Sequence, residues 1–265
     1  MRISNIIIVL ILAAFVAGCA HTPPTDPADP LESVNRKVYS FNNQADKLVL
    51  KPIAQGYTTV VPSLARQGIT NFFHNLGYPT VIVNDFLQAK FLQGGQDLLR
   101  FIVNSSYGIG GLIDVGSNIG LPSHDEDFGQ TLGHWGVGPG WFLMVPFVGP
   151  SDNRDAIGRV AGIFTSPTHY LPGRYDLPVY SVAALHIINI RANLLGTDSL
   201  LESQFDPYIF IRTAYLQRRR ALVYDGNPPQ TDLYFPPPDS SSTTDRSSTP
   251  PTSDAKSSAG ADKSR

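Results

Sequence analysis

The sequence predicts a mainly α-helical protein, and three observations indicate this fold class. Apolar residues recur at spacings of three and four along several segments, as they do on one face of an amphipathic helix. An Asp-Pro pair opens two of these segments, and this pair favours the start of a helix. Strand signals are few, and the best of them covers Trp141 to Val145.

The first predicted helix begins with a capping box. Asp29, Pro30 and Glu32 supply a cap acceptor, a proline at the first helical position and an acidic residue at the third. The apolar face of the 18-residue helix that follows consists of Leu31, Val34, Val38, Phe41, Ala45 and Leu48. We expect this helix to end at Pro52, because proline has no N–H for the next helical hydrogen bond.

Six further helices are expected along the chain. Two of them begin at a proline, and the last opens with the pair Asp206 and Pro207. Their predicted ranges are residues 62–76, 79–88, 95–105, 155–164, 176–195 and 206–224. The pattern therefore places helices on both sides of a central stretch that has no helical period.

The N-terminal residues have the features of a bacterial lipoprotein signal peptide. The apolar run from Ile6 to Ala17 is well short of the roughly 20 residues that span a bilayer. The residues Val16-Ala17-Gly18-Cys19 resemble the lipobox, whose cysteine is acylated and becomes the new N-terminus. A buried free thiol is the alternative for Cys19. On the strength of the lipobox we expect Cys19 to be the lipid anchor. The two or three acyl chains that it would then carry are enough to hold a protein durably on a membrane.

The chain divides into four predicted parts. A signal peptide (1–18) precedes a lipidated, proline-containing tether (19–28), a helical domain (29–226) and a tail (227–265). The tail is rich in Pro, Ser and Thr and has almost no apolar residue after Phe235. Such a segment buries too little surface to offset its ordering entropy, so we expect the tail to be disordered.

Composition excludes several classes of function. Cys19 is the one cysteine among 265 residues, so a disulfide or a thiolate metal site is excluded. The formal net charge of −2 becomes −3 when Arg2 leaves with the signal, which gives no case for nucleic-acid binding. Charged residues are 16% against 42% hydrophobic residues, yet no later apolar run is long enough to span a bilayer. The mature protein therefore folds beside a membrane or lies in it without a standard spanning helix.

The central stretch is rich in glycine. Residues 108–149 contain 11 of the 23 glycines. The same 42 residues carry large apolar side chains: Leu112, Ile113, Val115, Ile119, Trp135, Trp141, Phe142, Met144 and Phe147. Turns explain some of the glycines, because glycine adopts positive φ at no steric cost. An apolar, glycine-rich segment must nevertheless lie in protein, in lipid or in a channel wall.

Six motifs in order resemble the MlaA (VacJ) family of outer-membrane lipoproteins. They are DPLESVNRKVYSFN (29–42), NFFHNLGYPTVIVNDFLQ (71–88), RFIVNSSYGIGGLIDV (100–115), DFGQTLGHWGVGPG (127–140), VPFVGPSDNRD (145–155) and DPY (206–208). Each motif alone is weak, but together they are highly specific. Two departures are local: Trp141-Phe142 stands where the family often has Pro-Tyr, and Ala89 replaces a common glycine.

The resemblance implies a fold, a location and an activity. Members of the family form a mostly helical ring with a central channel, embedded mainly in the inner leaflet of the outer membrane. The ring removes phospholipid mislocalised in the outer leaflet and passes it to the soluble periplasmic shuttle MlaC, which maintains lipid asymmetry. Trimeric porins hold the ring in place. It uses no ATP itself, and no cofactor or metal is expected.

A polar lumen would accept a lipid headgroup while the acyl chains keep to apolar surface. We expect the first part of the glycine-rich segment, with the polar residues beside it, to line this path. The candidate residues are Asn104, Ser105, Gly108, Gly110, Gly111, Asp114 and Asn118.

Enzymatic alternatives have weaker signals. His124, Asp125, Glu126, Asp127 and His134 offer metal ligands or an acid–base group, but their spacing matches no zinc signature, and a solvated loop with a helix cap at Asp125 or Asp127 is favoured. Asp114 fits a turn or cap better than a catalytic carboxylate.

The usual lipase and NTPase signatures are absent from the sequence. The run Arg218-Arg219-Arg220 fits contact with anionic headgroups or an acidic partner, and equally cations near a helix C-terminus. The alternative functions are a lipid-modifying hydrolase and a passive structural lipoprotein of the outer membrane.

Overall fold

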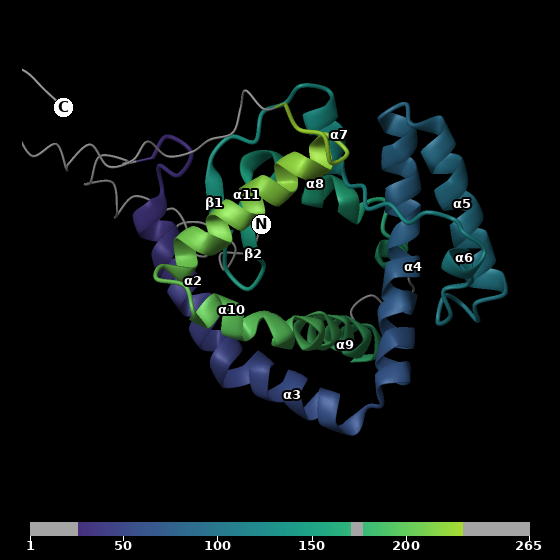
Figure 1. Ribbon diagram of the computed structural model, residues 1–265, viewed down its shortest axis with the longest axis horizontal. Helices are drawn as coiled ribbons and strands as arrows, with labels where there is room; N and C mark the ends of the chain where they lie inside the picture. The colour runs from purple at the N-terminus through teal and green to yellow at the C-terminus, as the bar shows by residue number, and fades with distance from the viewer. Residues whose placement is uncertain (1–25, 171–176, 230–265) are drawn as a thin grey trace, which may run out of the picture. The chain divides into compact units, whose positions relative to one another are not determined.

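A computed structural model describes residues 26–170 and 177–229, and these residues are mainly helical (Figure 1). The helices are α2 (Glu32–Ala45), α3 (Lys51–Val60), α4 (Ser63–Leu87), α5 (Phe91–Ser106), α6 (Val115–Asn118), α7 (Phe128–His134), α8 (Asn153–Ile163), α9 (Leu177–Leu194), α10 (Asp198–Glu202) and α11 (Pro207–Val223). Shorter turns are the π-helical η1 (Asp46–Leu50) and the 3₁₀ turns η2 (Pro167–Tyr170) and η3 (Leu195–Thr197). One hairpin pairs β1 (Phe142–Val145) with β2 (Gly149–Asp152).

Within residues 26–228 the helices follow one another around an opening (Figure 1). The α2–η1–α3 rod turns sharply into α4, and α5 folds back against the outer side of α4. The ring is closed where the first and last helices meet. Both oxygens of Asp206, before α11, accept hydrogen bonds from Arg36 of α2 at 3.2 and 2.8 Å.

The predicted first helix continues past its expected end. The π-helical turn η1 joins α2 to α3 without leaving helical backbone angles, and Pro52 stands in the first turn of α3. The wider turn of a π-helix accommodates a residue that donates no hydrogen bond, so Pro52 does not end the rod. The predicted break at Pro52 is therefore wrong.

The capping box predicted at Asp29 is also absent, because α2 begins at Glu32 and has no side-chain cap. The Asp29 carboxylate is instead fully buried. It accepts hydrogen bonds from Asn35 at 2.8 Å and from Arg212 at 3.0 Å. Tyr208 of α11 also donates to it. Asp29 thus connects the start of the domain to its last helix.

Helix α4 runs for 25 residues and contains Pro79, so the predicted helices 62–76 and 79–88 are one helix. An internal proline costs about 3 kcal/mol through its missing hydrogen bond. The neighbouring side chains Tyr78 and Val81 are buried, at 1% and 9% exposure. Their packing favours an unbroken helix over the break that proline alone predicts.

The hairpin carries the hydrophobic core of the domain. Its strands are antiparallel, with Phe142 opposite Asp152 and Val145 opposite Gly149. Phe142 and Met144 pack with Tyr208 between α2 and α11. The predicted strand 141–145 is confirmed, whereas β2 has the sequence Gly-Pro-Ser-Asp and carries no strand signal.

The ordered contacts begin inside the predicted tether. Asp26 is buried and forms an ion pair with Arg212 at 2.9 Å, so the fold includes residues before the predicted start at residue 29. At the other end, the compact unit closes at Pro228, two residues beyond the predicted boundary. The signal peptide, its lipobox with Cys19 and nearly all of the predicted tail lie outside the described residues.

The distribution of polarity is inverted relative to an ordinary soluble domain. Among the described residues, eight hydrophobic side chains are buried, against nineteen polar or charged ones. Large hydrophobic side chains are exposed instead, including Leu92 at 79% and Val60 at 80%. None of the described helices combines the length and the apolar composition needed to cross a bilayer.

Candidate functional site

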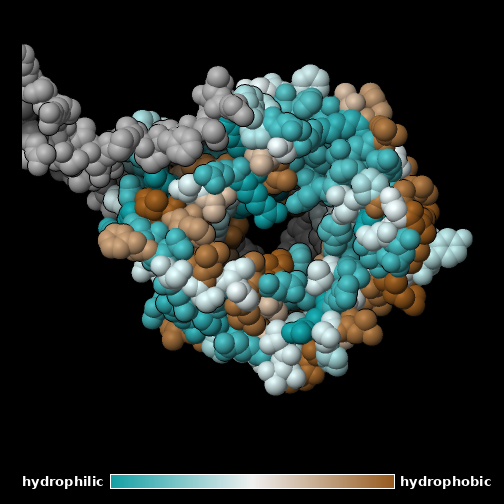
Figure 2. Space-filling model, in the orientation of Figure 1, coloured by the Kyte–Doolittle hydropathy of each residue, from teal (hydrophilic) through white to brown (hydrophobic). Residues whose placement is uncertain are grey.

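An opening passes through the ring and is the candidate functional site (Figure 2). Hydrophilic residues gather above it, over α8 and α11, and hydrophobic residues gather on the outer rim over α5. In Figure 1 the opening is bordered by α2, α4, α8, α9, α10 and the hairpin. The later part of the glycine-rich segment, which contains β1 and the turn after it, therefore reaches the edge of the opening.

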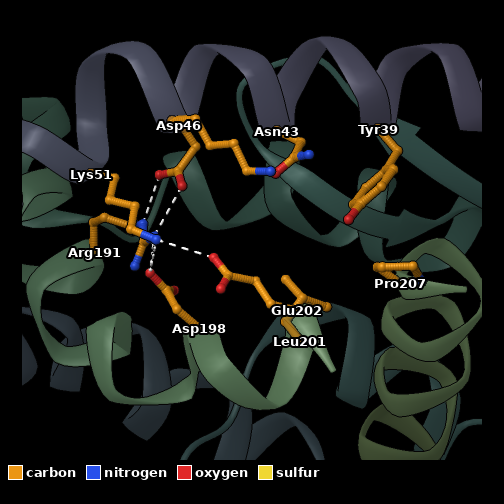
Figure 3. Close-up of a pocket in the computed structure, with 10 residues that line it drawn as sticks. Tyr39, Asn43, Asp46, Lys51, Arg191, Asp198, Leu201, Glu202 and Pro207 are labelled. Atoms are coloured by element: carbon orange, nitrogen blue, oxygen red, sulfur yellow. Dashed lines mark hydrogen bonds and ion pairs between the residues drawn. The ribbon is translucent and has the colours of Figure 1, made fainter. Parts of the chain in front are cut away.

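A network of charged side chains lies where α9 and α10 meet the rod (Figure 3). The Arg191 guanidinium donates to both oxygens of Asp46, at 2.6 and 2.9 Å, and to Asp198 at 3.0 Å. The Lys51 ammonium lies 2.9 Å from the same oxygen of Asp198 and 3.3 Å from Glu202. The network joins η1 and α3 to α9 and α10.

The geometry holds these groups in their charged forms. Hydrogen bonding to Asp46 raises the pKa of Arg191 above its usual value, against the effect of burial. Burial raises the pKa of Asp198, but hydrogen bonds from Arg191 and Lys51 outweigh it and lower this pKa. Both shifts favour the charged forms of Arg191 and Asp198.

Two pockets share Asp46, Arg191 and Asp198 of this network as a common wall. The first, of about 240 Å³, is lined by charged residues together with Tyr39, Asn43, Leu201 and Pro207. The second, of about 320 Å³, adds the apolar side chains of Met144, Pro150, Leu194 and Ile211. A polar pocket thus adjoins a largely apolar one, which is the arrangement an amphipathic ligand requires.

The residues predicted for the lipid path lie on the other side of the ring. In Figure 1, α4 stands between the opening and the pair α5–α6. Asp114 caps α6 by accepting from the backbone N–H of Ser117, as the predicted capping role requires. Its carboxylate also accepts from Arg100 at 2.6 Å and from Asn104 at 3.1 Å. Asn104 in turn accepts from the N–H of Gly116 at 2.8 Å.

The other predicted path residues belong to the same turn. Ser105 accepts a hydrogen bond from Asn75 of α4 at 2.9 Å. An added Cβ would lie 2.2 Å from a backbone oxygen at Gly108 and 2.5 Å from Asn75 at Gly111. Gly110 faces open space, and Asn118 is exposed at the end of α6. The structure brings these residues together around the turn between α5 and α6, where Gly108 and Gly111 are tightly packed. Their contact with lipid stays a prediction.

The acidic loop before α7 is less solvated than the sequence predicts. Glu126 is buried and accepts from Lys90, Gln88 and Gln93 at 2.8, 2.7 and 2.9 Å. His124 lies 2.9 Å from the buried Asp97. Asp127 caps α7, which confirms one of the two predicted caps.

His134 is exposed and makes an edge contact with Trp135. Within residues 26–170 and 177–229, no three His, Asp or Glu side chains stand where they could hold a metal ion.

The arginine run near the end of α11 is divided between interior and surface. Arg219 is held between Asp127, at 2.6 and 2.9 Å, and Asp155. Tyr215 donates to the same Asp155. Arg218 is exposed and lies 3.7 Å from Asp125. Arg219 therefore connects α7, α8 and α11, and Arg218 presents its charge to solvent.

Sequence reasoning misses the charged network of the two pockets. Asp46 and Arg191 are 145 residues apart, and neither belongs to a motif with a known spacing. One signal was available: Asn189, Arg191 and Asn193 are polar residues near the end of a largely apolar helix. Asn189 is buried and donates to Thr70 at 2.8 Å, so both Asn189 and Arg191 have partners on other elements.

Comparisons with known proteins agree with this architecture. The profile of the MlaA lipoprotein family matches residues 27–222. The intermembrane phospholipid transport system lipoprotein MlaA of Escherichia coli (strain K12) is 38% identical over 217 residues, which cover 80% of this chain and 85% of that protein. The protein of the same description from Haemophilus influenzae is 31% identical and covers 85% of this chain and 93% of its own length.

A solved structure shows the same fold. It is described as the structural basis for maintenance of bacterial outer membrane lipid asymmetry. It has a TM-score of 0.66 and 37% sequence identity, and the match covers 75% of this chain and 99% of that one. The chain therefore belongs to the MlaA lipoprotein family.

Proposed function

We propose that this protein is an outer-membrane lipoprotein that removes mislocalised phospholipid from the outer leaflet and maintains lipid asymmetry. The observation that carries the proposal is the inverted polarity of the ring. Its outside exposes large hydrophobic side chains, while polar and charged groups lie inside and beside the opening (Figure 2). Relatives that are 38% and 31% identical are named as lipoproteins of an intermembrane phospholipid transport system.

The apolar outside fits hydrocarbon. Helices satisfy their own backbone hydrogen bonds, so a helical ring can lie in lipid without exposing unpaired N–H and C=O groups. Leu98, Leu99 and Ile102 on α5 are each about half exposed. Transferring such side chains from water to lipid contributes about 25 cal/mol for each Å² of apolar surface. We propose that this rim is embedded mainly in the inner leaflet.

The opening gives the phospholipid a route. A headgroup needs polar surroundings, and the charged network beside the opening supplies them. The acyl chains keep to the apolar pocket and to the membrane-facing surface. The path through residues 104–118 that the sequence suggests remains a separate prediction.

The anchor and the partners complete the proposal. Acylation of Cys19 would fix the protein to the periplasmic face of the outer membrane. A soluble periplasmic carrier of the MlaC type would receive the lipid, and trimeric porins would hold the ring. The protein itself would transport lipid without chemical change and without a cofactor.

A complementation experiment tests this function. A strain that lacks the protein should accumulate phospholipid in the outer leaflet, and the wild-type chain should restore asymmetry. The Cys19→Ala variant should accumulate as uncleaved precursor and should restore little of the lipid asymmetry. Purified protein incubated with labelled phospholipid should return it intact. Release of fatty acid or lysolipid would support a hydrolase, and normal asymmetry without the protein would support a passive structural role.

A further inference from the structure

The polar pocket in Figure 3 contains equal numbers of positive and negative side chains. The positive residues that line it are Lys47, Lys51 and Arg191, and the negative ones are Asp46, Asp198 and Glu202. Four of these six, Asp46, Lys51, Arg191 and Asp198, are joined by ion pairs, so each of them has a partner of opposite charge. The remaining two, Lys47 and Glu202, have hydrogen-bonding groups without a partner among the described residues.

Lys47 is exposed and makes no ion pair or hydrogen bond among the described residues. The Glu202 side chain is 60% exposed. One of its oxygens lies 3.3 Å from Lys51, and the other has no partner in the described part of the chain. The pocket therefore offers one free ammonium group and one carboxylate oxygen, on a wall whose other charges are already neutralised.

We propose that this pocket binds the headgroup of a zwitterionic phospholipid, with Lys47 contacting the phosphate and Glu202 contacting the ammonium group. A phosphate ester that carries an ammonium, as in phosphatidylethanolamine, has the two charges that these side chains complement. An anionic headgroup such as phosphatidylglycerol would satisfy Lys47 with its phosphate, but its uncharged glycerol would offer Glu202 no positive group.

The neighbouring pocket identifies the ligand as a lipid. The two pockets share Tyr39, Asn43, Asp46, Arg191, Asp198 and Leu201. Beyond this shared wall, Met144, Leu194 and Ile211 provide apolar surface for the glycerol and the first acyl carbons. A free phosphoethanolamine would use the first pocket alone and should therefore bind more weakly.

This inference rests on the proposed function and adds a headgroup preference to it. The test uses the full-length, acylated protein in detergent micelles. Acyl-labelled phosphatidylethanolamine and phosphatidylglycerol are titrated separately into wild type, Lys47→Gln, Glu202→Gln and the control Arg218→Gln. The Arg218 side chain is 73% exposed and lies outside the pocket, so the control makes a similar change of charge elsewhere.

Wild type should bind phosphatidylethanolamine about three- to tenfold more tightly than phosphatidylglycerol, the range of one charged hydrogen bond at a half-exposed site. Glu202→Gln should abolish this preference. Lys47→Gln should weaken the binding of both lipids by a similar factor, and Arg218→Gln should change the affinity for neither lipid. Circular dichroism melting curves should be nearly unchanged for Lys47→Gln and Arg218→Gln, because neither residue has a strong partner.

Equal affinity of the wild type for the two lipids, or a preference that survives Glu202→Gln, would overturn the inference. So would unchanged affinities in Lys47→Gln, or phosphoethanolamine binding as tightly as the diacyl lipid. The complementation experiment distinguishes failure of the headgroup preference from failure of the proposed transport function. A wild-type chain that restores asymmetry without headgroup preference keeps the proposed function, whereas one that restores nothing overturns the function itself.

Discussion

Arg191 of α9 donates two hydrogen bonds to Asp46, the first residue of the π-helical turn η1, at 2.6 and 2.9 Å. The bidentate pair joins a helix inside the ring to the rod that forms part of its wall. Both side chains are mostly buried, at 13% and 25% exposure. π-Helical turns are rare and occur often at functional sites, and here the turn directs a carboxylate at the pocket.

Removal of either partner should therefore destabilise the ring. Arg191→Gln and Asp46→Asn should each lower the free energy of unfolding by about 2 kcal/mol. Arg191→Gln leaves the mostly buried Asp46 carboxylate without its partner, and Asp46→Asn leaves Arg191 with Asp198 as its one carboxylate partner among the described residues. In a double-mutant cycle the coupling energy should be about 1–3 kcal/mol. Denaturant unfolding in detergent measures both, with Arg218→Gln as the surface control. Additive effects of the two substitutions would show that the pair contributes nothing of its own.

Ala89 ends α4 in a conformation that suits glycine. Its φ is 60°, and the N–H groups of Ala89 and Lys90 donate to Phe86 and Asp85 at 3.1 and 2.9 Å. This is the Schellman arrangement, in which the residue after the helix is usually glycine.

Ala89→Gly should raise the free energy of unfolding by about 1 kcal/mol, because the left-handed conformation costs an L-residue roughly 1–2 kcal/mol. Ala161→Gly inside α8 is the matched control and should lower stability by about 1 kcal/mol. Thermal melting of the two variants beside wild type gives the answer. A lower melting temperature for Ala89→Gly would mean that the Cβ makes a contact worth more than the strain.

Sequence patterns predicted the helices well because their apolar faces are local and periodic. They failed at Pro52 and Pro79, where a π-helical turn and buried neighbours outweigh the local effect of proline. They failed again at Asp29, whose carboxylate has partners on α11, 179 and 183 residues later. Long-range polar pairs of this kind leave no period in the sequence, so the sequence patterns did not predict the charged pocket.

The strand β2 illustrates the same limit. Its residues have low strand propensity, and only pairing with β1 makes them a strand. The glycine-rich segment was correctly identified as unusual, but glycine density alone does not say which neighbour the backbone approaches. The close neighbour of Gly111 is Asn75 of α4.

Two adjacent glycines give a matched test of this close approach. Gly110 and Gly111 both have positive φ, at 69° and 94°, so alanine is strained at either position. An added Cβ meets Asn75 at 2.5 Å at Gly111 and meets nothing at Gly110. Gly111→Ala should therefore lower the melting temperature clearly more than Gly110→Ala. Equal losses would mean that the turn shifts away from α4 at no cost. Impaired lipid removal in Gly110→Val, at normal protein level, would support the predicted lipid path.

A substitution at Asp114 distinguishes a role in packing from contact with lipid. Its carboxylate neutralises Arg100, which is only 2% exposed. Asp114→Asn keeps the volume and removes the charge, so it should lower stability by about 2 kcal/mol. We expect transport per folded molecule to stay normal, measured as outer-leaflet phospholipid against protein level by immunoblot. Reduced transport with unchanged stability would instead place this carboxylate on the lipid path.

Asp85 gives the domain a dependence on pH. Burial and, to a smaller extent, the nearby carboxyl of Asp97 raise its pKa to about 7, against the opposing effect of a hydrogen bond from Gln93. In the unfolded chain the pKa is near 3.8. Between these two values the folded state binds more protons than the unfolded state. Stability should therefore fall as pH rises from about 4 to about 7.

Asp85→Asn should remove this dependence, because an amide has no charge to bury and its oxygen can still accept from Gln93. The variant should be more stable than wild type at pH 8, and the difference should shrink towards pH 4. Denaturant unfolding at several pH values measures it. Asp125→Asn is the control, because that side chain is 68% exposed and should shift stability little at any pH. A stability difference between Asp85→Asn and wild type that stays constant from pH 4 to pH 8 would show that Asp85 is ionised throughout.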